Sequence, residues 1–209
     1  MFHVEQSDIS EAQIEALLAP YLPEIPAGLA AKLSQYLNLL FKWNARTNLT
    51  AIRDPGQIVQ RHFGESLFAG RHVGFETKTL LDLGSGAGFP GLPIALLRPE
   101  IAVTLAESQN KKATFLREAV RTLGLQNVEV WAERAEALPE TRQFDIVTLR
   151  AVDHMAAAFA AAVPRASREI LLLAGAHPEL PADFTVEPPV LIPGSQSSYL
   201  IRAMKSIPD

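Results

Sequence analysis

Apolar residues in the first third of the chain recur at helical spacing. Ser10 and Gln13 have the pattern of a capping box in front of a first amphipathic helix, which Pro23 and Pro26 would end. Asp54-Pro55 has the pattern of an N-cap followed by proline at the first helical position. The apolar positions predict three helices. They are Ile14, Leu17, Leu18 and Tyr21 in the first, Leu29, Leu33, Tyr36, Leu37, Leu40 and Phe41 in the second, and Ile58, Val59, Phe63 and Leu67 in the third.

From about residue 77 onward, short apolar strands alternate with helical stretches. The predicted strands cover residues 79–83, 101–106, 128–131, 144–149 and 170–173, and the helical stretches between them cover 90–97, 111–123, 133–138 and 153–163. This alternation predicts a parallel sheet with helices on both faces. The proline-containing tail after Gly175 predicts loops and an edge hairpin around Tyr199-Leu200-Ile201. We therefore expect an N-terminal helical extension over residues 1–75 and an α/β domain over residues 76–209.

The composition is that of a folded globular protein. Of 209 residues 48% are hydrophobic and 20% are charged, which is enough apolar surface for a core without covalent cross-links. The absence of cysteine excludes disulfides, thiolate metal sites and cysteine nucleophiles. The N-terminus lacks a secretory pattern, and the longest apolar run, residues 155–163, is shorter than the roughly 20 residues of a membrane span. We expect a cytoplasmic protein without a membrane partner.

Charge is distributed unevenly along the chain. The net charge is −4, which is not typical of a nucleic-acid-binding protein, but residues 42–72 carry five basic and two acidic side chains. Phosphate contacts need only a local basic face. The candidates for such contacts are Arg46, Arg53, Arg61, Lys111 and Lys112, and a solvated helix surface remains the alternative for each of them.

A glycine cluster lies between the first predicted strand and the following helix. Gly84, Gly86 and Gly88 there allow a tight turn and a close approach of a ligand to the backbone. Glu107 follows Gly88 by 19 residues, at the end of the second predicted strand. An acidic residue about 20 positions after such a loop accepts hydrogen bonds from ribose hydroxyls. The pattern predicts a nucleotide-like cofactor.

Two features separate this loop from a dinucleotide site. Gly86, Gly88 and Gly91 match the dinucleotide template, but Asp82 directly precedes the loop, where an acid could meet a cationic ligand. Pro90 and Pro93 delay the following helix, so the loop is open rather than closely apposed to a helix N-terminus. An open loop favours the zwitterionic methionine part of S-adenosylmethionine over a pyrophosphate.

With these residues in place, the chain resembles the 16S ribosomal RNA guanine-N7 methyltransferases, also called glucose-inhibited division protein B. The resemblance covers roughly residues 35 to 175. It rests on residues 84–93 (GSGAGFPGLP), on 42–52 and 61–63 upstream, and on 107–112, 134–136 and 144–151 downstream. The chain departs from the family at Glu133, at Gly175-Ala176-His177 and at residues 193–198, where a glycine, a Lys-Gly pair and an arginine are expected.

The resemblance implies a Rossmann-like class I methyltransferase fold, with a mostly parallel seven-stranded sheet and an N-terminal helical extension. It implies S-adenosylmethionine as cofactor, 16S ribosomal RNA or the small ribosomal subunit as partner, and a monomer. The implied cofactor-binding residues are Gly84, Ser85, Gly86, Gly88 and Phe89 in the loop, Glu107, Ser108 and Gln109 at the ribose, Ala135 and Glu136 at the adenine, and Arg150 facing the reaction centre.

The chemistry of guanine N7 sets what the protein has to supply. N7 carries a lone pair and no proton, so attack on a methyl group needs alignment rather than a general base. Residues 148–152 (TLRAV) lack the Asn/Asp-Pro-Pro-aromatic motif of enzymes that methylate exocyclic amines. We expect no catalytic base and no metal. His62 and His154 are interpreted as packing or surface residues, and Trp43 as a core residue or a stacking platform for a base.

Other function classes remain open at this point. A nicotinamide-dependent oxidoreductase would use the same sheet, but we find no Tyr-x-x-x-Lys pair. A methyltransferase acting on another RNA, a protein or a small molecule would share the cofactor loop, and so would a non-catalytic protein that binds S-adenosylmethionine. Arg150 could also form only a structural ion pair with Asp82 or Glu136.

Overall fold

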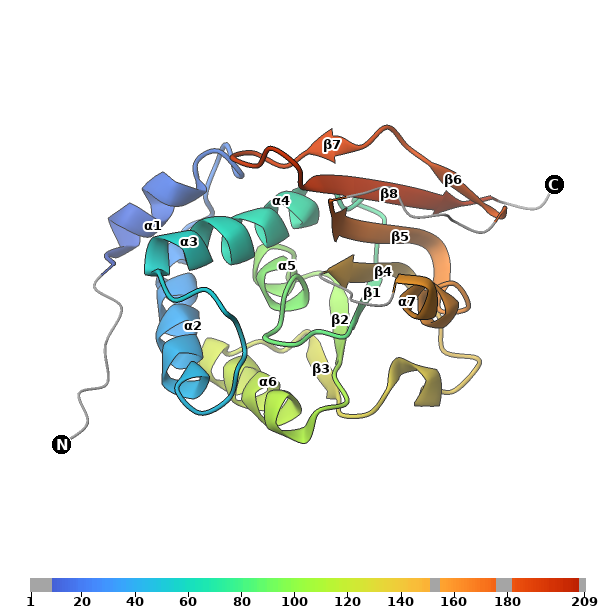
Figure 1. Cartoon of the computed structure of the whole chain (residues 1–209), viewed down its shortest axis with the longest axis horizontal. Helices are drawn as coiled ribbons and strands as arrows, with labels where there is room; N and C mark the ends of the chain where they lie inside the picture. The colour runs from blue at the N-terminus through green and yellow to red at the C-terminus, as the bar shows by residue number, and fades with distance from the viewer. Residues whose placement is uncertain (1–8, 151–154, 176–181, 207–209) are drawn as a thin grey trace.

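One sheet forms the centre of the molecule in the computed structural model, which describes residues 9–150, 155–175 and 182–206. The strands are β1 (Thr79–Leu83), β2 (Ala102–Ala106), β3 (Val128–Trp131), β4 (Phe144–Arg150), β5 (Ala166–Ala174), β6 (Phe184–Val186), β7 (Val190–Leu191) and β8 (Tyr199–Lys205). Seven of them follow in the order β3-β2-β1-β4-β5-β8-β6, and β7 also pairs with β8 (Figure 1). The first five are parallel, whereas β8 runs antiparallel to β5 and to β6. The predicted mostly parallel sheet is confirmed.

The N-terminal helices begin where the sequence predicts. The helices are α1 (Glu11–Leu18), α2 (Leu29–Asn44), α3 (Pro55–Ile58), α4 (Glu65–Arg71), α5 (Gly91–Leu97), α6 (Asn110–Leu123) and α7 (Met155–Ala162). At α1 the Ser10 hydroxyl accepts from the Gln13 amide and the Gln13 side chain accepts from the Ser10 amide, so both halves of the capping box form. At α3 the Asp54 carboxylate accepts from Gln57 N at 2.7 Å, in front of Pro55.

The third predicted helix contains a wider turn. Between α3 and α4 lies the π-helical segment η1 (Val59–Gly64), so one continuous helical run extends from Pro55 to Arg71. Such π segments are rare and occur frequently at functional sites. Here η1 carries Arg61 and His62, which take part in the site described below.

One sequence prediction for the second half is wrong. Residues 133–138 do not form a crossover helix but only a single 3₁₀ turn, η2 (Ala135–Ala137). The reason is Pro139, because the residue before a proline is driven to extended backbone, and Leu138 has φ −60° and ψ 145°. The predicted edge hairpin is present, because β6 and β7 pair antiparallel with β8 at this end of the sheet, while β8 itself lies between β5 and β6 with Leu200, Ile201 and Ala203 buried. Asp153, His154 and Ala176-His177 lie outside the described residues.

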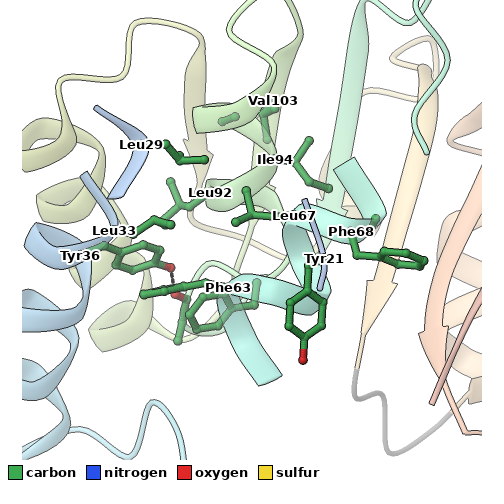
Figure 2. Close-up of a cluster of buried hydrophobic side chains, with 14 of the residues drawn as sticks. Tyr21, Leu29, Leu33, Tyr36, Phe63, Leu67, Phe68, Leu92, Ile94 and Val103 are labelled. Carbon is green, nitrogen blue, oxygen red and sulfur yellow. Dashed lines mark hydrogen bonds between the residues drawn. The ribbon is translucent and has the colours of Figure 1, made fainter. Parts of the chain in front are cut away.

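Apolar side chains fill both faces of the sheet. In the central strands, successive residues point to opposite faces: Leu80 belongs to the core on the side of the N-terminal helices, and Leu81 to the core beneath α7. Figure 2 shows the first core, where Leu33 and Tyr36 of α2, Phe63 of η1 and Leu92 of α5 meet. The N-terminal helices and one face of the sheet therefore bury their apolar residues against each other.

Candidate functional site

The carboxyl ends of four neighbouring parallel strands bring the sequence-predicted site residues to one edge of the sheet. The glycine loop follows β1, Glu107 follows β2, the η2 turn follows β3, and Arg150 is the last residue of β4. These strands are adjacent, because β1 pairs with both β2 and β4, and β2 pairs with β3. Ligands of open α/β sheets bind at this edge, at the point where the strand order reverses. Here that point lies between β1 and β4.

The backbone of the glycine loop is tied to β2, and the space beside two of its glycines is free. Gly84 and Gly86 have φ values of +72° and +57°, in the left-handed region that favours glycine. The amides of Gly84 and Ser85 both donate to the Ala106 carbonyl, at 2.9 and 3.0 Å, which ties the loop to β2. A side chain placed on Gly84 would meet nothing within 4 Å, and one on Gly86 would meet only the Gly84 carbonyl at 3.8 Å. The space beside these two glycines is therefore free.

Glu107 joins this loop to the start of α6. Its Oε2 accepts from Gly86 N at 2.9 Å and its Oε1 accepts from Gln109 N at 2.8 Å. The residue is only 6% exposed. Each carboxylate oxygen has a second lone pair, so Glu107 can accept two further hydrogen bonds. Ser108 and Gln109 are exposed beside it.

Asp82 lies beneath the loop rather than at its open side. The carboxylate is 1% exposed, and it accepts from Gly91 N at 3.1 Å and from the Thr148 hydroxyl at 2.8 Å. Burial raises the pKa of Asp82 from 3.8 to about 6, against the effect of these hydrogen bonds. The suggestion that Asp82 meets a cationic ligand directly is not supported by this position. Its role in the structure is to join β1, β4 and the start of α5.

Phe89 is a core residue at the base of the loop. It is 9% exposed and packs against Tyr36, Phe63 and His62, with ring centroids 5.4, 5.7 and 4.7 Å away. The fully buried Tyr36 hydroxyl donates to the Ala87 carbonyl within the loop (Figure 2). Ser85 and Gly88 are also buried. These residues shape the loop from beneath, and the N-terminal helices support it.

Arg150 is held by residues of the N-terminal helical run. Its Nη2 donates to Glu65 Oε2 at 2.8 Å and to the Arg61 carbonyl, and it lies 3.2 Å from His62 Nδ1. The side chains of Arg150 and Glu65 are 12% and 10% exposed. The partner of Arg150 is therefore neither Asp82 nor Glu136, the two structural partners considered from the sequence. Sequence reasoning missed Glu65, because no local pattern relates it to a residue 85 positions away.

His62 is a neutral packing residue, as the sequence interpretation favoured. An arginine only donates, so Nδ1 accepts from Arg150, and Nε2, 2.7 Å from the Thr50 hydroxyl, carries the proton. Burial, and then the positive charges of Arg150 and Arg61, lowers the pKa of His62 to about 3. Asn44 fixes the loop that carries Thr50 through hydrogen bonds to Leu49, at 2.8 Å, and to Thr50.

The η2 turn is fixed by a residue that the sequence analysis did not single out. Arg165 is 5% exposed, and its guanidinium donates to four carbonyl groups of the segment between β3 and β4. Two of these are Glu136 O at 3.3 Å and Leu138 O at 2.7 Å. Ala135 is buried in this turn and Glu136 is exposed. The η2 segment thus depends on an arginine that precedes β5.

The candidate RNA-contacting residues differ in their surroundings. Arg46, Arg53, Arg61 and Lys111 are exposed, and Lys112 is half-buried. Trp43 packs edge-on against Phe115, and its indole N–H donates to Glu118 at 3.1 Å. It therefore joins α2 to α6, in agreement with the core interpretation.

Residues 9–150, 155–175 and 182–206 contain no group of three or more His, Cys, Asp or Glu side chains arranged to hold a metal ion. Within the same ranges, no helix has the length and apolar character needed to cross a membrane.

Solved structures with a similar fold are methyltransferases and a protein that binds S-adenosylmethionine. A variant of MtNAS in complex with S-adenosylmethionine has a TM-score of 0.57 at 13% identity, over 98% of this chain and 87% of that one. The N-methyltransferase NodS from Bradyrhizobium japonicum WM9 has a TM-score of 0.54 at 15% identity, over 69% and 94%. These likenesses show the fold, which is the Rossmann-like class I methyltransferase fold.

The sequence comparisons identify the family. A protein from Xanthomonas euvesicatoria pv. vesicatoria named ribosomal RNA small subunit methyltransferase G is 42% identical over 196 residues, which is 90% of each chain. A protein of the same name from Stenotrophomonas maltophilia strain K279a is 44% identical over 179 residues, 81% of this chain and 84% of that one. The family model described as rRNA small subunit methyltransferase G matches residues 29–183. The chain therefore belongs to the rRNA small subunit methyltransferase G family.

Proposed function

We propose that this protein transfers the methyl group of S-adenosylmethionine to N7 of a guanine in 16S ribosomal RNA. The observation that carries the proposal is the open glycine loop beside Glu107, at the reversal point of the sheet, in a member of this methyltransferase family. The relatives named above are small subunit rRNA methyltransferases. The choice of N7 follows from the family resemblance and from the absence of an amine-methylating motif after β4.

The residues present fit the cofactor. The free space beside Gly84 and Gly86 admits a ligand to the backbone, and the two remaining lone pairs of Glu107 match the two hydroxyls of a ribose. We infer that Glu107, Ser108 and Gln109 hold the ribose, and that Ala135 and Glu136 meet the adenine. In this proposal Ser85, Gly88 and Phe89 set the shape of the loop, and Arg150 faces the reacting groups.

Alignment is the main contribution of the protein in this proposal. S-adenosylmethionine supplies a methyl group made electrophilic by its sulfonium charge. Guanine N7 offers its lone pair directly, so no side chain has to remove a proton. The neutral His62, whose two ring nitrogens are both engaged, is consistent with this because it is not poised to act as a base. Holding the reacting groups in line supplies on the order of 7–11 kcal/mol in favourable cases.

The substrate is an RNA, and we propose the small ribosomal subunit or its 16S RNA as the partner of a monomeric enzyme in the cytoplasm. Arg46, Arg53, Arg61 and Lys111 are exposed cations that could contact phosphates, and Lys112 is partly accessible. The target base has to be presented at the edge of the sheet where β1 and β4 end. Local opening of the RNA loop is therefore part of the proposal.

Methyl transfer to ribosomal RNA tests the function. Small ribosomal subunits and naked 16S RNA from a strain that lacks this gene are incubated with the purified protein and methyl-labelled S-adenosylmethionine. We expect label in 16S RNA as N7-methylguanosine at one position, and none in subunits from the parent strain. Label at another atom would refute the N7 assignment, and labelling of protein or small molecules instead of RNA would refute the substrate.

A further inference from the structure

Arg150 presents an unusual division of its hydrogen-bond donors. All of the contacts described above are made by Nη2, to Glu65, to the Arg61 carbonyl and to His62. Among the described residues, Arg150 Nη1 is the one buried side-chain nitrogen or oxygen without a hydrogen-bond partner. A buried donor of this kind needs an explanation, because burial removes its water and nothing replaces it. Arg150 is the last residue of β4, at the edge of the sheet where the glycine loop and Glu107 also lie.

The ion pair fixes the direction of that free donor. A guanidinium is planar and rigid, so holding Nη2 at 2.8 Å from Glu65 Oε2 also determines where Nη1 lies. The guanidinium carbon lies 5.8 Å from the centre of the Phe89 ring, at the base of the glycine loop. Arg150 is therefore held between the η1–α4 helical run and the loop.

Glu65 also neutralises the positive charge of Arg150. The methyl donor is a cation, and a guanine methylated at N7 is a cation as well, so an unpaired guanidinium nearby would oppose both. Glu65 is paired with Arg150 and His62 is neutral, so these three side chains together carry little net charge. The pair can donate a hydrogen bond without repelling the reacting groups.

We propose that Glu65 is a positioning residue for methyl transfer: it holds and neutralises Arg150 so that Nη1 donates to an oxygen acceptor of the bound reactants. This inference rests on the proposed function. The acceptor is either the carboxylate of the methionine part of the cofactor or O6 of the target guanine. Both are oxygen acceptors that suit an arginine donor. The N-terminal helical run thereby takes part in the site and does not only cover the sheet.

Two product-like ligands and one matched control separate these possibilities. S-adenosylhomocysteine carries the amino-acid carboxylate, whereas methylthioadenosine lacks it and keeps the ribose and adenine. The control is Glu169→Gln, because Glu169 pairs with Arg202 at 2.6 Å, is also buried, with a side chain 5% exposed, and joins β5 to β8 away from the site. Calorimetric affinities for both ligands, kcat and KM for RNA, and the Tm are measured for wild type, Glu65→Gln, Arg150→Gln and the double variant.

If the acceptor is the carboxylate, Glu65→Gln weakens S-adenosylhomocysteine binding about tenfold and leaves methylthioadenosine binding unchanged. If the acceptor is guanine O6, both affinities stay at wild-type values and kcat falls about tenfold. In either case Glu65→Gln has little further effect in the Arg150→Gln background, because it acts through Arg150. Should Glu65→Gln fail to fold, Arg150→Lys, which keeps the charge but lacks Nη1, is compared with wild type in the same way.

The inference is overturned if Glu65→Gln behaves like Glu169→Gln, with a lower Tm but unchanged kcat and an unchanged ratio of the two affinities. Effects of Glu65→Gln and Arg150→Gln that simply multiply would overturn it too. A wild-type protein that binds neither ligand would refute the proposed function itself. Wild-type binding and rRNA methylation with an inert Glu65 would refute only this inference.

Discussion

Three acidic side chains near the carboxyl edge of the sheet have different partners. Glu107 accepts two backbone N–H groups, Glu65 pairs with a buried arginine, and Asp82 accepts one amide and one hydroxyl. Burial raises the pKa of both Asp82 and Glu65. The positive charge of Arg150 lowers both pKa values, and among the causes of the shift it ranks higher at Glu65, with which Arg150 forms an ion pair, than at Asp82. An acidic side chain thus suits the proposed ligand binding at Glu107, the proposed positioning at Glu65 and internal support at Asp82, according to what surrounds it.

Replacing Glu107 by Gln is expected to weaken S-adenosylhomocysteine binding by at least about tenfold. An amide has one oxygen, so its NH₂ would face either Gly86 N or Gln109 N, and one loop contact and one ribose contact would be lost. Isothermal titration measures the affinity, and the exposed Glu15→Gln on α1 serves as a control. Wild-type affinity in Glu107→Gln would contradict its assignment to the ribose.

The raised pKa of Asp82 predicts a specific pH dependence of the free energy of unfolding. Its folded-state pKa of about 6 lies above the ordinary 3.8, so its contribution is fully present below about pH 4 and is lost as the pH rises through 6. An asparagine side chain at this position would not titrate, and its amide can serve both Gly91 and Thr148. Relative to wild type, Asp82→Asn should therefore gain on the order of 1–3 kcal/mol in free energy of unfolding between pH 4 and pH 7. Urea denaturation at both pH values measures this, and a difference that is constant with pH would exclude the raised pKa.

At the scale of elements, the sequence predicts whatever depends on neighbours along the chain. The bounds of β1 and β3 and both predicted N-caps were correct, because strand alternation and capping are local. The loop after β1 was recognisable because its glycines need positive φ. The place of β8 between β5 and β6 was not predictable from a tail rich in proline, since it depends on pairing with a strand formed about 30 residues earlier.

For the site, too, the sequence predicts local features and misses contacts between distant residues. The spacing after the glycine loop predicts Glu107 as a site residue, and a strand end matched to a family motif predicts Arg150. Glu65 and Arg165 were missed because their partners lie 85 and about 27 residues away and no pattern in the sequence relates them. Long-range ion pairs and arginine contacts with loop carbonyls can be read only from the folded chain. The division of the chain between residues 75 and 76 stays a prediction.

The hydrogen bonds of Arg165 predict how the η2 segment contributes to cofactor binding. Arg165→Met keeps the aliphatic stem but leaves up to four carbonyl groups without their donor, each at a typical cost of about 1–3 kcal/mol if it remains buried. We expect a lower Tm and an equal loss of affinity for S-adenosylhomocysteine and methylthioadenosine, because both contain adenine. The exposed Arg168→Met is the control. Unchanged affinities in a folded Arg165→Met would remove η2 from the adenine site.

At the scale of the whole molecule, the N-terminal helices and the sheet share one apolar core. Leu33, Tyr36 and Phe63 are fully buried against residues of α5, β2 and α6. Tyr36 also bonds the glycine loop, and Glu65 holds Arg150. A helical extension that supports the site at these two points should not unfold independently of the sheet.

The two tryptophans allow a direct test of whether the helices and the sheet unfold together. Trp43 lies on α2 and Trp131 ends β3, so Trp43→Phe and Trp131→Phe each leave one fluorescent probe in a different part of the chain. Both probes should report the same urea midpoint. Leu33→Ala, introduced into each, should lower stability by about 2–5 kcal/mol and shift both midpoints together. A separate, earlier transition at Trp43 would show that the helices form their own unit.

A crystal structure of this protein with S-adenosylhomocysteine tests the proposed cofactor site most directly. We expect adenosine density over Gly84 and Gly86, with both ribose hydroxyls within hydrogen-bond distance of the Glu107 carboxylate and the adenine beside Ala135. Ligand bound elsewhere on the molecule, or a ribose whose hydroxyls do not reach Glu107, would contradict it.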